Sequence, residues 1–347
     1  MANEKQYNVA VVGATGAVGQ KIVHYLSENL FPINELKLLS SKRSAGTKVN
    51  FQDREITVEE ATADSFKNID IAFFSAGGSI SEKLAPEAVK HGAVVVDNTS
   101  HFRMDENVPL VVPEVNPEHL ENHKGIIANP NCSTIQMVAA LKPIQDKFGL
   151  KRIIVSTYQA VSGAGLAAEQ ELTKQTGQRL AGEEMEANVL PAGSDKRHFP
   201  IAFNALPQID VFDEDGYTKE EWKMMNETKK IMGDENLQVA ATCVRLPVFT
   251  SHSESVYIET DNEVSVDEIK EAIKQGEGLM LEDDPATQTY PTPLSATDKK
   301  EVFVGRIRKD VDHKNGFHMW IVSDNLVKGA AWNTVQIAET LVKNKIV

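Results

Sequence analysis

The sequence contains two cysteines, Cys132 and Cys243, whose surroundings differ. Cys132 lies in the segment ANPNCST, where a Pro-Asn turn leads into a helical pattern. If Asn131 is the N-cap of that helix, Cys132 lies in its first turn, where unpaired N–H groups and the positive end of the helix dipole favour a thiolate. A nucleophile is therefore expected at Cys132, although a free cysteine is more commonly a small buried residue. Cys243, in the apolar run AATCV, fits that structural role.

Arg245 and His252 lie seven residues apart in the segment RLPVFTSH, where a strand pattern runs into a loop around a proline. A guanidinium can bind a substrate carboxylate, and an imidazole can donate or accept a proton near neutral pH. Taken singly, each residue also fits a plainer interpretation, as a surface arginine and as a hydrogen-bonded histidine. Together they are candidates for the charge-binding group and the general acid/base that a reacting thiolate needs.

A glycine-rich turn, GATGAVG at residues 13–19, follows the apolar run VAVV and precedes a helical pattern. A dinucleotide pyrophosphate needs main-chain N–H groups at a helix start and residues without Cβ, so that the chain can approach it closely. The spacing is GxxGxxG rather than GxGxxG, and alone it also fits an ordinary tight turn. Because a strand, a helix and further βαβ patterns surround it, the turn predicts nucleotide binding.

The segment LLSSKRS at residues 38–44 ends the second predicted strand, where NAD-binding proteins place an Asp or Glu on the ribose 2′-hydroxyl. It contains hydroxyls and two cations, Lys42 and Arg43, but no acid. A 2′-phosphate fits better than a bare hydroxyl, so the segment predicts NADP; a solvated loop is the alternative. A thiolate beside a nicotinamide can form a thioester that hydride reduces, or attack an aldehyde from which hydride leaves to NADP⁺.

The elements that must position these groups begin with short apolar runs that alternate with helical patterns. Strands are predicted at YNVAVVG, ELKLLSS, IDIAFFSA, AVVVDN and GIIANP, with helices at 17–26 and around 82–91. This spacing predicts βαβ units and a parallel sheet. A domain boundary is expected where the last of these strands meets the helix that contains Cys132.

The pattern of predicted strands and helices changes after this boundary. RIIVSTYQAV predicts a strand, AAEQELTKQTG and residues 220–232 predict helices, and residues 182–216 are rich in Pro, Gly and Asp without periodicity. LQVAATCVRLPV and ESVYIETD are predicted to be strands of an antiparallel sheet, which makes this domain α+β. The last segment has one apolar helical stripe, and we expect it to pack back on the first domain.

The length of 347 residues predicts two domains. With 36 Lys and Arg against 50 Asp and Glu, the net charge of −14 argues against nucleic acid or anionic membranes as partners. His119 and His123 are four residues apart, but they do not form an HExxH motif and no third ligand accompanies them. The two cysteines are too few for a zinc cluster, so no metal is expected. The start of the chain does not resemble a signal peptide and no apolar stretch has membrane length, so a cytoplasmic protein is expected.

Several motifs together resemble the bacterial aspartate-β-semialdehyde dehydrogenases. They occur in order along the chain: GATGAVG (13–19), DNTSHFRMD (97–105), VPEVNP (112–117), ANPNCST (128–134), TYQAVSGAG (157–165), EEWKMMNETKKI (220–231), RLPVFTSHSE (245–254) and DNLVKGAAWNTVQIAE (324–339). The resemblance implies an α/β protein with a Rossmann-type, parallel-sheet NADP-binding domain at 1–131, on which a C-terminal helix at 329–347 packs. It also implies an α+β catalytic and dimerisation domain at 132–328 with a mostly antiparallel sheet, and a homodimer, with tetramers in some members.

The resemblance also implies roles for individual residues. Cys132 is the nucleophile, His252 the acid/base residue, and Gln159 orients the acyl group. The substrate contacts are Arg103 and Lys223 for the phosphate, Arg245 and Glu220 for the carboxylate and amino group, and Asn131 and Gln159 beside the nucleophile. The cofactor contacts are Gly13, Thr15, Gly16, Ala17, Val18, Arg43, Ser44, Ser162, Gly163 and Asn325.

The implied reaction is the NADPH-dependent reductive dephosphorylation of L-4-aspartyl phosphate to L-aspartate-4-semialdehyde, through a Cys132 thioester. The implied pathways are lysine (diaminopimelate), threonine, methionine and isoleucine biosynthesis. Glyceraldehyde-3-phosphate dehydrogenase and N-acetyl-glutamyl-phosphate reductase also react through a cysteine thioester. The segments NPNCST and RLPVFTSH of this chain resemble neither enzyme. No tyrosine is followed by Lys four residues later, as a short-chain dehydrogenase requires. A non-catalytic NADPH-binding sensor is a further alternative, but it has no need of Cys132, Gln159, Arg245 and His252 together.

Overall fold

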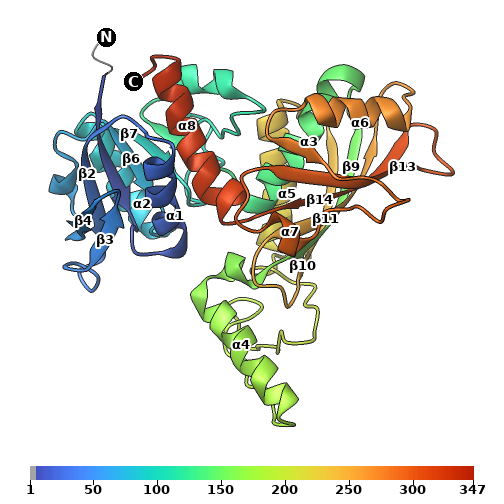
Figure 1. Cartoon of the computed structure of the whole chain (residues 1–347), viewed down its shortest axis with the longest axis horizontal. Helices are drawn as coiled ribbons and strands as arrows, with labels where there is room; N and C mark the ends of the chain where they lie inside the picture. Colours follow the sequence, from blue (N-terminus) through green and yellow to red (C-terminus); the bar gives the residue numbers. More distant parts are fainter. Residues whose placement is uncertain (1–4) are drawn as a thin grey trace. The chain divides into compact units, whose positions relative to one another are not determined.

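The computed structural model describes residues 5–347, which form two compact units. The first unit runs to Pro130 and also contains Ala330–Val347, and the second is Asn131–Gly329. Figure 1 shows that each unit is built around its own β-sheet. Residues 1–4, which start the predicted first domain and the polar stretch before its first strand, lie outside the described residues.

The first unit contains a parallel sheet with the strand order β5-β2-β1-β6-β7-β8. Its strands are β1 (Tyr7–Val12), β2 (Ile33–Ser40), β5 (Glu59–Glu60), β6 (Ile71–Phe74), β7 (Val94–Asp97) and β8 (Ile126–Ala128). A hairpin of β3 (Lys48–Phe51) and β4 (Arg54–Thr57) lies between β2 and β5 in the sequence. This order is that of a Rossmann-type doubly wound sheet, in which ligands bind at the carboxyl ends of the strands where the order reverses.

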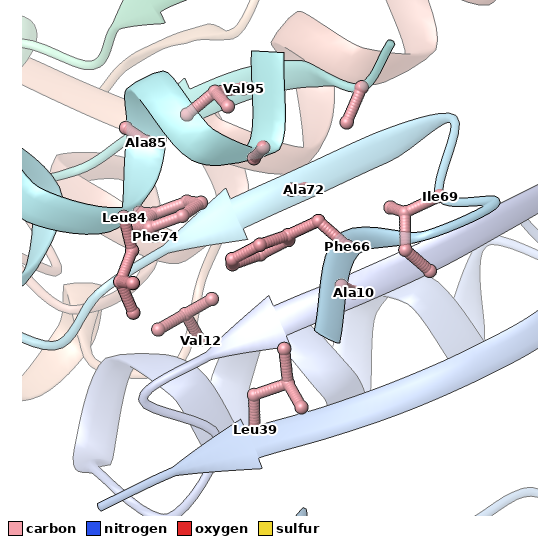
Figure 2. Packing of buried hydrophobic residues seen from close by; sticks show 12 residues of the cluster. Ala10, Val12, Leu39, Phe66, Ile69, Ala72, Phe74, Leu84, Ala85 and Val95 are labelled. Atoms are coloured by element: carbon pink, nitrogen blue, oxygen red, sulfur yellow. The ribbon is translucent and has the colours of Figure 1, made fainter. Parts of the chain in front are cut away.

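The central strands β1, β6 and β7 are apolar on both faces, as expected for a parallel sheet covered by helices. Ala10 and Phe74 lie on the face that packs against α2 (Gly78–Lys90) and η1 (Ala63–Phe66), where Phe66 stacks on Phe74 with ring centroids 5.6 Å apart (Figure 2). The alternate residues Val9, Val11 and Phe73 are equally buried. The continuous apolar runs in the sequence therefore reflect burial on two sides.

Helices α1 (Ala17–Glu28) and α8 (Trp332–Lys343) also belong to the first unit and pack against each other (Figure 1). α1 contacts β1, and α8, drawn in red, contacts β7. A π-helical turn, η4 (Val327–Ala331), leads into α8. The short 3-10 helix η2 (Pro117–Asn122) precedes β8.

The second unit contains a mixed sheet with the order β10-β9-β11-β14-β13-β12. Its strands are β9 (Arg152–Gln159), β10 (Gln238–Arg245), β11 (His252–Glu259), β12 (Leu279–Leu281), β13 (Val302–Lys309) and β14 (Gly316–Ser323). β11 pairs antiparallel with β9, as predicted, and β14 pairs antiparallel with both β11 and β13. The antiparallel prediction was wrong for β10, which lies parallel to β9 at the end of the sheet. The helix α5 between β9 and β10 returns the chain to the same end of the sheet, which permits this parallel pairing.

Three helices of the second unit pack on this sheet: α3 (Cys132–Phe148), α5 (Lys219–Met232) and α6 (Val266–Gln275). α3 contacts both α5 and α6. The remaining elements are η3 (Val161–Ala164), α4 (Leu166–Leu180) and α7 (Pro293–Ala296). α4 and the irregular chain that follows it extend from the end of the sheet marked by β10 (Figure 1). No helix within residues 5–347 is long and apolar enough to cross a membrane.

Candidate active site

The helix α3 begins at Cys132, and Asn131 occupies its N-cap position. The Asn131 side chain does not cap the helix, because its amide Nδ2 donates to Glu220 Oε1 at 2.8 Å. The main-chain N–H of Asn131 donates to Glu227 Oε2 at 2.7 Å. α5 therefore holds Asn131, the residue before Cys132, through two carboxylates that lie two turns apart on one helical face.

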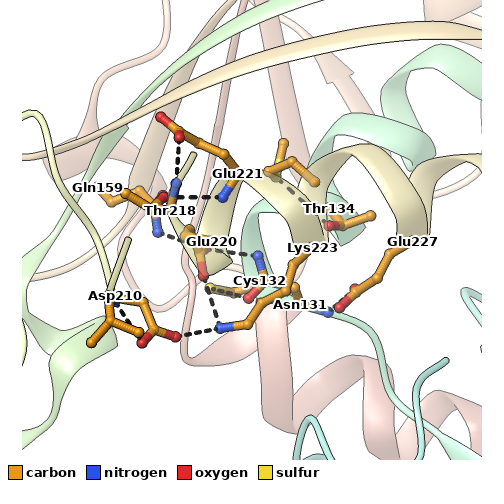
Figure 3. A network of polar contacts seen from close by, with 12 residues as sticks. Asn131, Cys132, Thr134, Gln159, Asp210, Thr218, Glu220, Glu221, Lys223 and Glu227 are labelled. Carbon is orange, nitrogen blue, oxygen red and sulfur yellow. Dashed lines mark hydrogen bonds and ion pairs between the residues drawn. The ribbon is translucent and has the colours of Figure 1, made fainter. Parts of the chain in front are cut away.

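Glu220 is the centre of a buried network that joins three elements (Figure 3). Its carboxylate accepts from Asn131, from Gln159 Nε2 at 3.2 Å and from Lys223 Nζ at 3.3 Å. Burial alone would raise the pKa of Glu220, but Lys223 and these amides, with Arg245, lower it to about 2. Glu220 is therefore a carboxylate at any physiological pH.

The helix α5 is fixed at its N-terminus by a capping box and by a contact with the sheet. Thr218 and Glu221 form a capping box, in which each side chain accepts from the other residue's main-chain N–H. The other carboxylate oxygen of Glu221 accepts from the main-chain N–H of Cys243 on β10 at 3.1 Å. The first turn of α5, and with it Glu220, is thereby tied to the sheet.

His252, the first residue of β11, lies with Nε2 at 3.3 Å from Cys132 Sγ. Its other ring nitrogen, Nδ1, accepts from the main-chain N–H of Ala160 at 3.1 Å. The ring is fully buried, and burial together with the neighbouring Arg245 lowers the pKa of His252 to about 3. The nucleophile candidate and the acid/base candidate are thus in direct contact.

Gln159 and Arg245 lie side by side because they are register partners at the ends of β9 and β10. Thr157 Oγ1 donates to Gln159 Oε1 at 2.9 Å, which turns the Gln159 NH₂ group toward Glu220 and His252. Arg245 Nη1 donates to Ala160 O at 2.7 Å, and its Nε has no hydrogen-bond partner among the described residues. A buried guanidinium with an unused donor is a site for an anionic ligand group.

A cavity of about 410 Å³ within the second unit lies beside these residues. Asn131, Cys132, Gln159, Gly163, Glu220, Lys223 and Arg245 all contribute to its wall. Sequence reasoning missed the segment 189–194, which also lines this cavity, and Asp210, whose carboxylate accepts from Lys223 Nζ at 3.2 Å. Both come from the region without periodicity, which gave no signal for their position.

Three other residues of the second unit were predicted to contact the cofactor. Ser162 and Asn325 are hydrogen-bonded to each other, and Asn325 Oδ1 also accepts from the main-chain N–H of Ser251 at 2.9 Å. Gly163 lies against the site, because a Cβ added there would be 3.0 Å from Arg245 Nη1 and 3.3 Å from His252 Nε2. A side chain at position 163 would therefore press on the side chains of both Arg245 and His252.

A second cavity, of about 460 Å³, lies within the first unit at the carboxyl ends of its strands. Its wall includes Gly13, Thr15, Gly16, Arg43 and Ser44, together with Lys42, Ser40, Ser41 and Glu60. Ala17 and Val18, also predicted to contact the cofactor, are the first residues of α1 just behind the turn. Glu60, on the edge strand β5, was missed because its position beside the second strand is set by sheet pairing.

Close packing explains two of the glycines beside this cavity. Gly13 has φ +87°, and a Cβ there would lie 2.5 Å from Ser75 O. A Cβ at Gly19 would lie 2.1 Å from Gly13 O, so the helix could not pack against the turn. Gly16, which also lines the cavity, is less crowded, because an added Cβ there would meet only Gly13 O at 3.4 Å.

Arg103 is buried in the first unit and donates to Asn98 O at 3.0 Å, near Asp97. Cys243 is fully buried, which raises the pKa of its thiol. Within residues 5–347, no group of three or more His, Cys, Asp or Glu is placed to hold a metal ion.

Comparisons with known proteins identify this arrangement. Residues 8–123 match the family model "semialdehyde dehydrogenase, NAD binding domain", and residues 141–328 match "semialdehyde dehydrogenase, dimerisation domain". The aspartate-semialdehyde dehydrogenase of Bacillus subtilis (strain 168) is 63% identical over 98% of this chain and 99% of its own.

Solved structures agree with the sequence comparisons. Aspartate semialdehyde dehydrogenase II from Vibrio cholerae matches with a TM-score of 0.93 at 48% identity, covering 98% of this chain and 99% of that chain, and has also been solved in complex with ASA. The Candida albicans aspartate semialdehyde dehydrogenase with NADP matches with a TM-score of 0.73 at 27% identity. The match covers 99% of this chain and 100% of that chain.

The fold and the family models place the chain among the semialdehyde dehydrogenases, oxidoreductases with an NAD-binding domain and a dimerisation domain. Within this class, the chain belongs to the aspartate-semialdehyde dehydrogenase family. The resemblance in the sequence motifs and the predicted fold class are confirmed.

Gly329 yields a prediction about how Cys132 is positioned. A Cβ at residue 329 would lie 2.7 Å from Cys132 Cβ and 3.2 Å from its Cα, and neither atom can rotate away. We expect Gly329→Ala to displace the nucleophile and lower kcat/KM by about 100-fold, as ångström misplacements in active sites do.

The matched control is Gly177→Ala in the middle of α4, where an added Cβ meets nothing within 4 Å. It should keep full activity and raise the free energy of unfolding by about 0.5–1 kcal/mol, because alanine favours the helix. Steady-state kinetics and thermal unfolding of both variants check this. Equal activity of the two would show that Gly329 does not position Cys132.

Proposed function

We propose that this protein catalyses the reversible, NADPH-dependent reductive dephosphorylation of L-4-aspartyl phosphate to L-aspartate-4-semialdehyde. The observation that carries the proposal is the contact of Cys132 Sγ with His252 Nε2 beside a cavity walled by Gln159, Glu220 and Arg245. The pathways that use the product, those of lysine, diaminopimelate, threonine, methionine and isoleucine, are part of the same proposal.

The charges of the cavity complement this substrate. Aspartyl phosphate has an α-carboxylate, an α-ammonium and an acyl phosphate, so it needs cations and one acid in a protein of net charge −14. The Arg245 guanidinium, which lines the cavity, suits the carboxylate, and Glu220, ionised down to a pH of about 2, suits the ammonium. Lys223, and Arg103 by family resemblance, serve the phosphate.

The second unit would carry out the acyl-transfer chemistry. The Cys132 thiolate attacks the acyl carbon, the tetrahedral intermediate expels phosphate with the C–O electron pair, and a thioester remains. Main-chain N–H groups at the start of α3 can stabilise the oxyanion. Gln159, whose NH₂ group points toward Glu220 and His252, orients the acyl group. After reduction at the carbonyl carbon, the C–S bond breaks, its electron pair returns to sulfur, and the aldehyde leaves.

The cavity of the first unit fits a nicotinamide dinucleotide phosphate. Gly13 and Gly16, which have no side chains, line this cavity next to the start of α1. A pyrophosphate bound there can accept hydrogen bonds from main-chain N–H groups. Arg43, Ser44 and Lys42 lie where a ribose 2′-phosphate would bind, although Glu60 is in the same wall. When bound, NADPH supplies the hydride equivalent that reduces the thioester.

The dimerisation domain of the family supports a homodimer as the working assembly. Ile154, Tyr158 and Trp320 lie together on the sheet of the second unit, where Tyr158 and Trp320 are in ring contact at 5.4 Å and Ile154 is 38% exposed. An exposed apolar sheet face of this kind suits a second copy of the chain.

The reaction is tested in the reverse direction with L-aspartate-4-semialdehyde, phosphate and NADP⁺. We expect NADPH formation that requires phosphate and is at least about 100-fold more efficient than with glyceraldehyde 3-phosphate or N-acetyl-glutamate semialdehyde, since unmatched charges leave buried groups unpaired.

Cys132→Ala should remove this activity, whereas Cys243→Ala, the matched control, should retain turnover, because Cys243 is buried beside Thr157 and does not line the cavity. Phosphate-dependent turnover by Cys132→Ala would refute the thioester mechanism.

The cofactor preference is tested separately. We expect NADP⁺ to be preferred over NAD⁺, and Arg43→Ala to raise the KM for NADP⁺ by about 10-fold or more while leaving that for NAD⁺ unchanged, because one charge-assisted contact to the 2′-phosphate is lost. Arg54→Ala, on the exposed hairpin strand β4, is the control. Comparable efficiency with both cofactors in the unaltered protein would contradict the proposal.

A further inference from the structure

Lys223 lies between two carboxylates in the wall of the second unit's cavity (Figure 3). Its Nζ donates to Asp210 Oδ2 at 3.2 Å and to Glu220 Oε2 at 3.3 Å. Glu220 is three residues before Lys223 on α5, whereas Asp210 comes from the irregular segment that precedes this helix. The proposed function uses Glu220 for the substrate ammonium and leaves Asp210 without a role.

The main chain at Asp210 adopts a conformation that few side chains tolerate. Its φ is +67°, in the left-handed region where glycine, asparagine and aspartate are the usual residues. Asp210 Oδ1 accepts from the main-chain N–H of Val211 at 2.9 Å, so the second oxygen, Oδ2, is the one that binds Lys223. Main chain of this kind occurs mostly at functional sites, where the surrounding contacts hold it.

The segment that contains Asp210 is attached on both sides. After it, the main-chain N–H of Lys219, the first residue of α5, donates to Val211 O at 3.0 Å. Before it, Gln208 Nε2 donates to Asp210 O at 3.1 Å and to Asp195 Oδ2 at 2.8 Å. The carboxylate of Asp210 is therefore held next to the Lys223 ammonium by contacts that do not involve Lys223 itself.

The charges of the cavity wall show what this contact does to phosphate. Besides Cys132, four charged side chains among the described residues line the cavity, two cations and two anions. Glu220 suits the substrate ammonium, and Arg245 suits the substrate carboxylate. The remaining pair is Lys223 with Asp210. A phosphate that binds Lys223 therefore meets an ammonium whose charge is already opposed by a second carboxylate.

Asp210 and a bound phosphate compete for the same ammonium, because both are anions that bind Lys223 through charge-assisted hydrogen bonds. The side chains of Lys223 and Asp210 are 27% and 36% exposed, so solvent weakens their attraction without removing it. A pair of this kind lowers the affinity for phosphate by a modest factor and still allows phosphate to bind.

We propose that Asp210 is a positioning residue that acts through Lys223, opposing phosphate there so that the anion binds weakly and exchanges readily with solvent. The inference rests on the proposed function, which assigns the phosphate to Lys223. In the biosynthetic direction, the expelled phosphate must leave before the next substrate brings its own. Tighter binding of free phosphate would slow this departure without stabilising the transition state.

The variant Asp210→Asn tests the proposal with little change of shape. Asparagine tolerates the left-handed main chain, and its Oδ1 can still accept from Val211. Its NH₂ group would then face Lys223, donor against donor, and of the two carboxylates only Glu220 would bind the ammonium. We expect the KM for phosphate in the semialdehyde assay to fall about 10-fold, together with the product-inhibition constant of phosphate in the biosynthetic direction.

A half-reaction without phosphate separates this effect from general damage to the site. The Cys132 thioester and the burst of NADPH form before phosphate takes part, so the burst rate of Asp210→Asn should change far less than its KM for phosphate. The control is Asp215→Asn, an exposed residue of the same irregular segment, which should leave both quantities unchanged. A slower burst with a raised KM for every substrate would show that Asp210 only supports the fold, and would overturn the proposal.

Phosphate binding is also measured directly, by a ³¹P NMR titration of the full-length protein with inorganic phosphate and without semialdehyde or cofactor. Asp210→Asn should bind phosphate about 10-fold more tightly than the wild type. Equal or weaker binding would overturn the proposal. Because this readout needs no turnover, its failure is distinguishable from failure of the proposed function, which would appear as a lack of phosphate-dependent NADPH formation.

A double-mutant cycle shows whether Asp210 acts through Lys223. If it does, Asp210→Asn should change the affinity for phosphate by less than about twofold in a Lys223→Ala background, against about 10-fold in the wild-type background. A full effect that persists without Lys223 would mean that Asp210 repels phosphate by itself, and would overturn the role assigned to the pair.

Discussion

The buried carboxylate of Glu220 is the interaction on which the site in the second unit depends. It accepts hydrogen bonds from Asn131, from the last residue of β9 and from Lys223 of its own helix. Loss of any one of these hydrogen bonds would leave a buried charge less compensated, and a hydrogen bond to a charged group is typically worth about 1.5–3 kcal/mol. The sheet, the helix α3 and the helix α5 are therefore held in one arrangement by electrostatics as well as by apolar packing.

The same arrangement needs main chain to approach side chains closely. Gly329 lies against Cys132, Gly163 lies against Arg245 and His252, and the peptide groups of Ala160 hold the latter two residues. At Gly329 and Gly163 the absence of a Cβ makes room for the neighbouring side chains. At Ala160 the main-chain N–H and C=O hold them by hydrogen bonds. The geometry around the sulfur therefore depends on residues that have no reactive side chain.

Much of this molecule could be predicted from the sequence, for physical reasons. The parallel sheet follows from apolar runs buried on both faces, and the start of α3 at Cys132 follows from the Pro-Asn turn. The pairing of β10 was predicted wrongly, because alternation along a strand shows which side is buried and not the direction of its neighbour.

The supporting residues of the site could not be predicted in the same way. Glu227, Asp210 and Ala160 reach it through contacts between segments far apart in the chain, and nothing in their local pattern distinguishes them from ordinary helix or loop residues. The family resemblance supplied the candidate reacting residues, but not the contacts that hold them.

The most direct test of the account is to trap the covalent intermediate on Cys132. The protein is mixed with L-aspartate-4-semialdehyde and NADP⁺ without phosphate, and NADPH formation and the mass of the Cys132 peptide are measured after quenching. We predict a burst of about one NADPH per chain and an aspartyl thioester on Cys132 that added phosphate discharges. The absence of a burst, or an acyl group on any other residue, would contradict the assignment of Cys132 as the nucleophile.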